Sequence, residues 1–338
     1  MRVTLATSIA LALLAFSPCV ARADDRPEFD VLPFATGLNK IADTELDLSF
    51  PKTGTAPARV SIAVPAAFGL APAAVGSTVA HADIDVFMGG KTTTIGGNVI
   101  VDDPARYVTN TCAPGTHSSV WVLFLTVAGQ PYVIPIYVDA SPTQPPTLQW
   151  CLLSPDVPQG AGGAPGGARL TYIGLEFHDS FRNPPTAGAY LWSATVTPFT
   201  TGTGDASPTT TYELRAVEAL PASLTTKSRY DAKHKVTVIS GRLARSGANV
   251  GDIHVHVFAA TSILGSYKEI AATYTDSHGA YSVKKKLKQT EWIATYVRQY
   301  IGDCMAPSTA PAGCVLQSYS PVLGDIARAV VPKPKKQR

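Results

Sequence analysis

SVWVLFLTVAGQPYVIPIYV, residues 119–138, is the stretch that decides the fold class. Its two apolar runs, SVWVLFLTV (119–127) and YVIPIYV (132–138), have the length and the β-branched and aromatic content of central strands. The residues between them, Ala128-Gly129-Gln130-Pro131, are typical of a turn. The stretch therefore predicts a buried β-hairpin.

Alternation of polar and apolar residues extends this β pattern in both directions. ELDLSF (45–50), RVSIAV (59–64) and HADIDV (81–86) each place their apolar residues on one face of a strand. No segment after residue 23 has a helical stripe, and 27 prolines and 27 glycines fit many short turns. We expect an all-β protein with two β-sandwich-like domains. Further strands are predicted at 168–178, 189–197, 210–217, 235–240, 253–259, 267–275, 280–287 and 292–297.

The first 23 residues have the pattern of a cleaved secretory signal peptide. Met1-Arg2 precedes an apolar run, and Ala21-Arg22-Ala23 is a small-x-small cleavage site. An alternative is a lipoprotein signal acylated at Cys19, although Pro18 fits that position poorly. No later run approaches the ~20 apolar residues that a membrane-spanning helix needs. We expect a secreted or extracytoplasmic protein, in the periplasm or at the cell surface, that does not span the membrane.

Four cysteines remain after residue 23, an even number that favours disulfides in an oxidising compartment. Three pairings are possible. We expect Cys112 with Cys151 and Cys304 with Cys314, because each pair then stays inside one proposed domain. The alternative is four unpaired buried thiols.

Charge divides the chain near residue 222. Residues 24–222 contain 9 Lys and Arg against 18 Asp and Glu, whereas residues 223–338 contain 17 against 7. We expect an acidic β-sandwich-like domain over 24–222, a basic one over 223–331 and a basic disordered tail over 332–338. The two halves either dock on each other, or the basic half meets an anionic surface such as a cell wall or acidic polysaccharide.

The segment PQGAGGAPGG, residues 158–167, is expected to have little order because glycine and proline dominate it. It is either a linker between two domains or a mobile loop inside one large N-terminal domain. The second interpretation is favoured, because the 168–219 stretch is short for a sandwich of its own.

A family resemblance appears in the C-terminal half. Gly241, the turn at Ser246-Gly247, the strand HVHV (254–257) and the segment TDSHGAY (275–281) resemble the carboxypeptidase-regulatory-like, transthyretin-like β-sandwich. The resemblance implies an accessory module with no catalytic residues and a role in support or adhesion. Within the turn, Asp276 is expected to accept backbone hydrogen bonds, Gly279 to take a positive φ, and Tyr281 to cover the core edge. For residues 24–222 we recognise no family.

Local catalytic motifs are absent from the sequence. There is no Gly-x-Ser-x-Gly, no His-Glu-x-x-His, no Cys-x-x-Cys and no phosphate-binding glycine loop. A site assembled from distant loops is left open. We expect no enzyme activity and no cofactor.

His254 and His256 are the weak candidate for a metal site. Residues two apart on a strand share a face, and His-x-His is a common way to offer two nitrogens to zinc or copper. The simpler alternative leaves both histidines on the solvated face, because the alternate apolar positions of this strand face the core. A third ligand would come from His234, Asp252 or His278.

Acidic and aromatic residues give two further possibilities. The pairs Asp83/Asp85 and Asp102/Asp103 are able to offer oxygens to calcium, or are solvated strand edges. The tryptophans would form a sugar platform if exposed, but their apolar neighbours favour core packing. They are Trp121, Trp150, Trp192 and Trp292.

Two runs of cations are the surface-binding candidates. The first either protects a sheet edge from pairing or contacts an anionic partner. The second lies in the predicted tail and would add affinity for an anionic cell envelope or polysaccharide. We do not expect specific nucleic-acid binding, because export is expected and the sequence contains no known nucleic-acid-recognition module. The residues are Lys284, Lys285, Lys286 and Lys288, and then Lys333, Lys335, Lys336 and Arg338.

The leading hypothesis is a non-catalytic secreted or cell-surface-associated β protein acting in adhesion, envelope association or protein interaction. One alternative is a carbohydrate- or metal-binding module. Another is an exported hydrolase whose site is dispersed over loops of the N-terminal domain.

Overall fold

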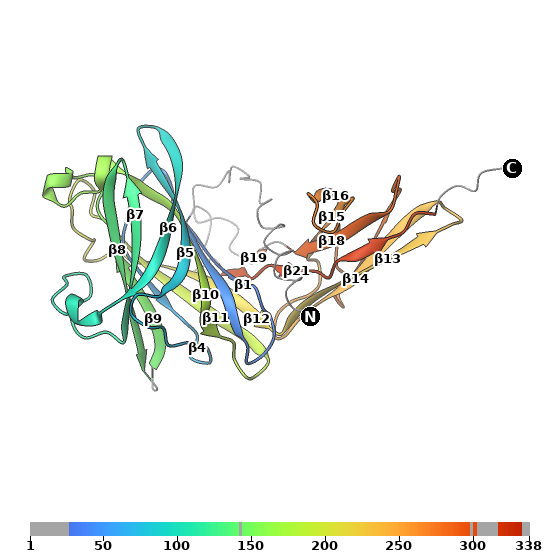
Figure 1. Cartoon of the computed structure of the whole chain (residues 1–338), viewed down its shortest axis with the longest axis horizontal. Coiled ribbons are helices and arrows are strands. Elements are labelled where there is room, and N and C mark those ends of the chain that lie inside the picture. The colour runs from blue at the N-terminus through green and yellow to red at the C-terminus, as the bar shows by residue number, and fades with distance from the viewer. Residues whose placement is uncertain (1–26, 142–143, 298–299, 303–316, 333–338) are drawn as a thin grey trace.

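The computed structural model describes residues 27–141, 144–297, 300–302 and 317–332. These residues are all-β, as predicted, and their helical elements are three short 3-10 turns. None of the described segments forms a helix that is long and apolar enough to cross a membrane. Figure 1 shows a large curved sheet in the N-terminal half and an elongated C-terminal half beside it. The 3-10 turns are η1 (Pro104–Tyr107), η2 (Gln159–Ala161) and η3 (Pro165–Gly167).

One 14-stranded sheet makes up the N-terminal half. Its strands are β1 (Glu28–Pro33), β2 (Ile41–Ser49), β3 (Pro57–Ala63), β4 (Gly69–Leu70), β5 (Thr78–Met88), β6 (Lys91–Asp102), β7 (Ser119–Val127), β8 (Gln130–Ser141), β9 (Gln144–Cys151), β10 (Arg169–Arg182), β11 (Gly188–Pro198), β12 (Tyr212–Leu220), β19 (Tyr300–Gly302) and β20 (Gln317–Tyr319). Their order is β1-β2-β10-β5-β6-β7-β8-β9-β3-β11-β12-β20-β19, and β4 pairs with β10. The sheet curls until β1 packs against β12.

The predicted hairpin is confirmed. β7 and β8 pair from Ser119↔Val138 to Val127↔Gln130. Ala128 and Gly129 form the turn with φ of 49° and 74°, the sign that a tight two-residue hairpin turn requires at both central positions.

The curled sheet encloses one large hydrophobic core, and smaller clusters, one of which contains Tyr137, lie apart from it. Alternate residues of a strand face the core, as β2 shows: Leu46 and Leu48 are buried while their neighbours face outward. Each large side chain of this kind stabilises the fold by roughly 1.5–3 kcal/mol relative to exposure. The largest fully buried side chains include Trp150, Trp192, Tyr132, Tyr137, Phe177 and Phe181.

The expectation that residues 158–167 have little order is wrong. The segment forms η2 and η3, and Ala164 is buried in the same core as the strands on either side. Ala164 N–H donates to the carbonyl of Ser154 at 2.7 Å. A Cβ on Gly163 would lie 1.9 Å from the carbonyl oxygen of Val157, so glycine permits the close backbone approach that orders this segment.

The C-terminal half contains a three-stranded and a five-stranded sheet. The first has the order β13 (Ala222–Asp231), β14 (Val236–Arg245), β17 (Ala280–Lys285). The second has the order β16 (Lys268–Tyr274), β15 (His254–Ala260), β18 (Glu291–Val297), β21 (Val322–Leu323), with β22 (Ala327–Ala329) also paired to β18. Apolar side chains of both sheets meet in shared clusters, such as Leu243 with Val255 and Ile239 with Val257. The half is therefore a two-layer sandwich.

The turn predicted at 275–281 has the expected local geometry. Oδ1 of Asp276 accepts the N–H groups of His278 and Ala280, both at 2.9 Å. Gly279 has a φ of 79°, and Tyr281 is buried at the core edge. Hydrogen bonds from these backbone groups hold the pKa of Asp276 below its ordinary value.

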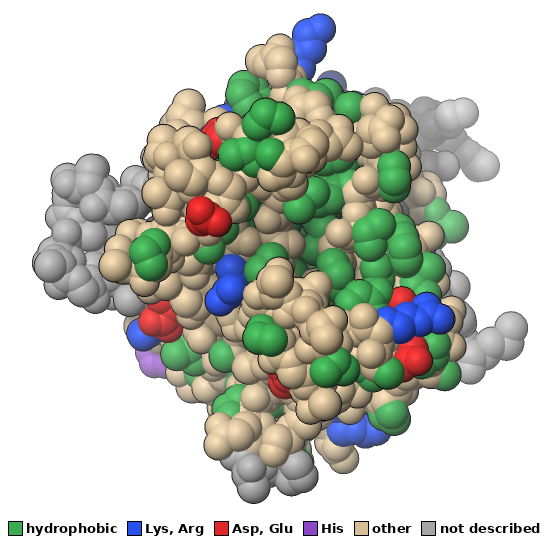
Figure 2. All heavy atoms as spheres, turned by 90° about the vertical axis from the view of Figure 1, so that its left-hand side faces the viewer, with side chains coloured by type: hydrophobic (Ala, Val, Ile, Leu, Met, Phe, Trp, Pro, Cys, Tyr) green, Lys and Arg blue, Asp and Glu red, His purple; other side chains and the backbone are tan. Residues whose placement is uncertain are grey.

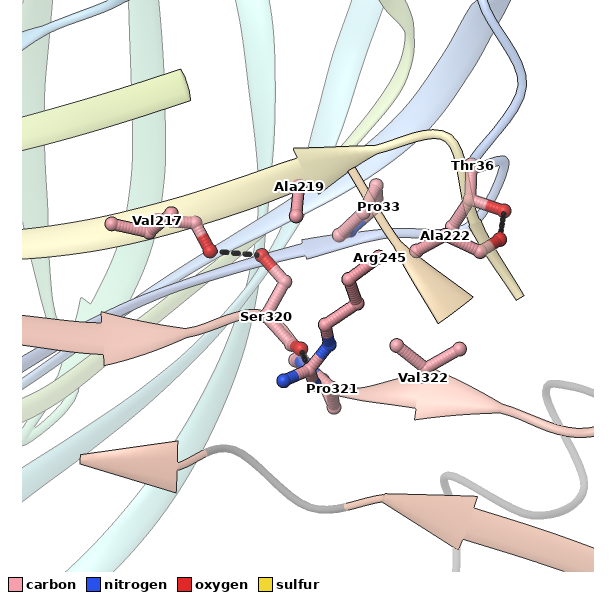
Figure 3. Close-up of a pocket in the computed structure, with 9 residues that line it drawn as sticks. All are labelled: Pro33, Thr36, Val217, Ala219, Ala222, Arg245, Ser320, Pro321 and Val322. Atoms are coloured by element: carbon pink, nitrogen blue, oxygen red, sulfur yellow. Dashed lines mark hydrogen bonds between the residues drawn. The ribbon is translucent and has the colours of Figure 1, made fainter. Parts of the chain in front are cut away.

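The two halves meet where β20 joins the first sheet (Figure 3). β20 runs parallel to β12, so a strand from beyond residue 223 extends the N-terminal sheet. Ser320 N–H donates to Val217 O at 2.9 Å, and Nη2 of Arg245 donates to Ser320 O at 2.7 Å. The cavity among these residues is about 10 Å³, room for about one water and no larger ligand.

Candidate surface-binding site

The lysine run 284–288 lies at one end of the C-terminal sandwich. Lys284 and Lys285 end β17, which is an edge strand of its three-stranded sheet, and Lys286 and Lys288 follow in the loop to β18. All four side chains are exposed. The position on an edge strand agrees with edge protection as one role of these charges.

The structure brings the start of the predicted tail to the same loop. Backbone N–H of Val331 donates to Oγ1 of Thr290 at 3.2 Å. Pro332 is the last described residue, and the tail cations 333–338 lie outside the described residues. The two cation runs, more than forty residues apart in sequence, are therefore joined to neighbouring points of the fold.

The β13–β14 turn adds two more cations. Thr237 on β14 lies opposite Lys285 on β17, so the turn 232–235 extends from the same end of the sheet. Lys233 and Lys235 in this turn are exposed. We call this surface the basic end and define it as Lys233, Lys235, Lys284, Lys285, Lys286 and Lys288.

The Asp231 carboxylate lies at the basic end, and its oxygens are already engaged. Oδ2 of Asp231 is 2.7 Å from Nδ1 of His234, and Oδ1 accepts the N–H groups of Lys233 and His234. The His234 side-chain bond is the largest reason why the pKa of Asp231 lies below its ordinary value. The remaining cations form no ion pair with a described residue.

The opposite end of the molecule is different. Figure 2 shows the outer side of the N-terminal half, where hydrophobic and uncharged polar side chains dominate and the few charges are scattered. Phe124 and Val133, which lie directly opposite each other on β7 and β8, are 47% and 45% exposed. This face thus lacks a cluster of lysines like that of the basic end.

His254 and His256 do share a face, but they are not equally solvated. Their ring centroids are 4.3 Å apart, and His254 also stacks on Tyr274 at 4.8 Å. His256 is only 8% exposed, and its Nδ1 is 2.9 Å from Oε1 of Glu269, so the expectation of two solvated histidines is wrong for His256. Neighbouring rings and the Glu269 carboxylate cover it.

The structure does not assemble the expected third metal ligand. His234 is bonded to Asp231 in its own turn, and Nδ1 of His278 is 3.2 Å from Ser277 Oγ. In the described part of the chain, no group of three or more His, Cys, Asp or Glu side chains is arranged to hold a metal ion. The metal site therefore remains a sequence hypothesis without a completed ligand set.

An acidic face that sequence reasoning missed lies on the outside of β2, β10 and β5. In register, Asp47 lies opposite Gly174, and Gly174 lies opposite Asp83; Glu45 lies opposite Glu176 one row further. Burial and then the neighbouring carboxylates raise the pKa of Glu45 to about 8. The sequence predicted that Asp83 and Asp85 lie at a solvated strand edge, and this is wrong: β5 is paired on both sides, so both residues lie in the middle of the sheet.

A tyrosine bridges this face. The Tyr172 hydroxyl donates to Oδ1 of Asp47 at 2.5 Å. Its ring lies over Gly174, where a Cβ would meet the hydroxyl oxygen at 2.6 Å. Glu-x-Asp and Asp-x-Asp spacing is visible in the sequence, but only the strand order brings the pairs together.

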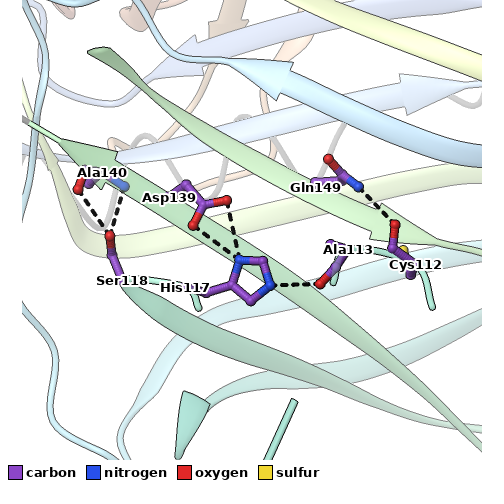
Figure 4. Close-up of polar contacts among 7 residues, drawn as sticks. All are labelled: Cys112, Ala113, His117, Ser118, Asp139, Ala140 and Gln149. Atoms are coloured by element: carbon purple, nitrogen blue, oxygen red, sulfur yellow. Dashed lines mark hydrogen bonds and ion pairs between the residues drawn. The ribbon is translucent and has the colours of Figure 1, made fainter. Parts of the chain in front are cut away.

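The loop before β7 is held by a disulfide and a histidine (Figure 4). Cys112 and Cys151 form a disulfide with their Cα atoms 5.9 Å apart, which is the first of the two predicted pairings; Cys304 and Cys314 lie outside the described residues. Nδ1 of His117 is 3.1 Å from Oδ1 of Asp139, and its Nε2 is 2.8 Å from the carbonyl oxygen of Ala113.

This histidine is not placed to activate a hydroxyl. Ser118 Oγ donates to Ala140 O and accepts from Ala140 N, so it bonds to β8 rather than to His117. Asp102 and Asp103 likewise hold the loop: Asp102 accepts from the Tyr107 hydroxyl at 2.8 Å, and Asp103 accepts the N–H of Ala105 at 3.0 Å. The arrangement fixes the backbone of this loop.

The tryptophans follow the core interpretation with one partial exception. Trp121, Trp150 and Trp192 are buried in the N-terminal core. Trp292 is half-buried on β18, with the guanidinium of Arg328 at 5.9 Å from its ring centroid. The four rings form no common exposed platform.

Comparison with known proteins adds no family. No family model matches the chain, and no curated protein matches it. Among solved structures, one chain described as the "D0-D1 domain of Intimin" aligns with 88% of this chain and 97% of its own, at 9% sequence identity and a TM-score of 0.20. A TM-score this low carries no argument about fold or function.

Proposed function

We propose that this is a non-catalytic, extracytoplasmic β protein that associates with an anionic component of the cell envelope through its basic end. The observation that carries the proposal is the hydrogen bond between Val331 and Thr290, because it fixes the residue after which the cationic tail follows in sequence next to the loop of Lys286 and Lys288. Clustered cations of one sign raise the local concentration of a polyanion and speed its association.

Two further observations support the proposal. The Cys112–Cys151 disulfide is typical of an oxidising compartment. The His117 side chain bonds to Asp139 and Ala113, and the neighbouring Ser118 hydroxyl bonds to Ala140, so these groups hold a loop. The carboxypeptidase-regulatory-like assignment of the C-terminal half, an accessory module, agrees with this role and is part of the proposal.

The test is sedimentation of the purified protein with isolated cell envelopes at low and high salt. A second protein that ends at Val331 lacks the tail but keeps the bond to Thr290. We expect binding that salt weakens, because exposed charge pairs are screened, and weaker binding without the tail. Salt-independent binding, or none at low salt, would contradict the proposal.

A further inference from the structure

The three-stranded sheet of the C-terminal half turns a row of cations outward. Arg229, Val238 and Lys284 lie opposite one another on β13, β14 and β17, and Lys227, Ser240 and Ser282 form the next row. Residues directly opposite each other on neighbouring strands share a face. Ile239 and Leu243 alternate to the other side and are buried against the second sheet.

We propose that this outward face binds one linear polyanion through Lys227, Arg229 and Lys284. The inference rests on the proposed function: it joins Lys284 of the basic end with Lys227 and Arg229 and places the ligand on one face of one sheet. Lys227 and Arg229 are about 7 Å apart along β13, and Lys284 is two strand spacings away, about 9.6 Å. Cations at these separations contact successive anionic groups of a single extended chain.

The rest of the face suits the same ligand. Ser240 and Ser282 place hydroxyl groups between the cations, and Val238 is the apolar residue of the row. Arg242 adds a fourth cation, whose Nε donates to the carbonyl of His278 at 2.8 Å. Among the described residues these two rows contain no carboxylate; Asp231, which faces the same way two residues beyond Arg229, is bonded to His234.

Edge protection does not explain all three cations. It accounts for Lys284, because β17 is a free edge. The outer side of β13 is already covered, since Leu224 bridges to Gly324 and Ser228 Oγ donates to Arg328 O at 2.9 Å. Edge protection therefore does not explain Lys227 and Arg229, whose side chains lie on the face of the sheet.

A lipid surface fits this face less well. Membrane-bound surfaces of this kind combine cations with apolar side chains that enter the bilayer. The large hydrophobic residues that are exposed in the described C-terminal half lie elsewhere: Leu264, Tyr274, Leu323 and Val330. A flat face of cations and hydroxyls favours a hydrated polymer.

Two consecutive lysines give a matched test. Lys284 belongs to the outward face, whereas Lys285 lies opposite Thr237, whose side chain is buried between the sheets. Both lysines are exposed, so Lys284→Gln and Lys285→Gln remove the same charge from neighbouring positions. Only the first removes it from the proposed face.

The probes are polygalacturonate, long-chain polyphosphate, neutral dextran, and vesicles of phosphatidylglycerol and phosphatidylcholine. Affinities are measured for the full chain and each variant over a range of salt concentrations. We expect at least one polyanion to bind, with Lys284→Gln and Arg229→Gln each weakening it about two- to fivefold. Each of these variants should also reduce the slope of log affinity against log salt by roughly one. Lys285→Gln, which removes a charge of the basic end but not of the face, should change both quantities less than Lys284→Gln does.

The outcomes separate the two proposals. Binding of polygalacturonate but not polyphosphate assigns a carboxylated polymer, and the reverse assigns a phosphate polymer. Polyanion binding that Lys284→Gln and Lys285→Gln weaken equally would overturn the face while leaving envelope association standing. Binding to the vesicles alone would overturn the proposal that the ligand is a polymer. No binding to any anionic probe would overturn both proposals.

Discussion

Trp192 donates its Nε1–H to Oε2 of Glu218 at 3.1 Å, inside the core of the N-terminal sheet. Glu218 is 1% exposed, and within the described chain its Oε1 has no hydrogen-bond partner. Burial raises the pKa of Glu218 to about 8, although the Trp192 bond opposes this. The carboxyl is therefore protonated at neutral pH.

This pKa predicts that stability falls with rising pH. The folded state keeps the Glu218 proton up to about pH 8, whereas the unfolded chain loses it near 4.5, so the free energy of unfolding decreases between these values and levels off above them. Glu218→Gln stays neutral and still accepts from Trp192. We expect the variant to be less pH-dependent and, at about pH 9, more stable by a few kcal/mol.

Urea unfolding at several pH values between about 5 and 9 measures this. Glu45, whose pKa is also raised to about 8, contributes over the same range in both proteins, so the difference between them isolates Glu218. Parallel pH profiles for the wild type and the variant would contradict the assignment.

Tyr172→Phe should destabilise the protein. It removes a hydroxyl that donates to the Asp47 carboxylate within a crowded acidic face. Hydrogen bonds to charged groups contribute about 1.5–3 kcal/mol, and we expect a loss in this range at neutral pH. Tyr190→Phe is the control, because the Tyr190 hydroxyl bonds to Thr186 in an exposed position. If chemical denaturation shows equal losses of unfolding free energy in the two variants, the acidic face does not strengthen the Tyr172 hydrogen bond.

Removing the disulfide should cost about 2–4 kcal/mol, since it closes a loop over a sequence separation of 39 residues. The double variant Cys112→Ala, Cys151→Ala is compared with the wild type in urea, with and without a reductant. We expect the reduced wild type to lose at least as much stability as the variant. If the reductant still lowers the stability of the variant, a second disulfide is present, as the predicted pairing of Cys304 with Cys314 requires. A variant as stable as the oxidised wild type would contradict the prediction.

His117→Gln should loosen the loop before β7. The histidine contacts both the Asp139 carboxylate and the Ala113 carbonyl, and glutamine cannot reproduce both contacts at once. We expect a loss of about 1–3 kcal/mol and faster proteolysis between residues 103 and 118. His234→Gln, which removes an exposed histidine–aspartate pair, should leave stability unchanged. Unchanged cleavage in His117→Gln would contradict this role for the histidine.

The strands could be predicted because their signal is local. The run 119–127 is a complete strand, and 189–197 and 168–178 fall within one residue of the starts of β11 and β10. Alternation fixes which residues face the core without reference to partners. Strand order has no such signal: nothing local states that β10 lies between β2 and β5, so the acidic face could not be foreseen.

The same limit applies to the candidate site. Both lysine runs are visible in the sequence, but the contact between Val331, which precedes the second run, and Thr290, which follows the first, depends on β22 pairing with β18. The burial of His256 depends on Glu269 arriving from β16. The order in 158–167 depends on a close backbone contact at Gly163 that composition alone does not reveal.

The parallel pairing of β20 with β12 has a consequence for biosynthesis. The ribosome completes the first eleven long strands of the large sheet by residue 220, yet the strand that covers the β12 edge is translated about a hundred residues later. Until then the nascent chain presents an unpaired strand edge, the kind of surface on which polypeptides misassociate. Fragments that stop near residue 222 would keep that edge permanently, so dissection of the protein into recombinant halves should give an aggregating N-terminal piece.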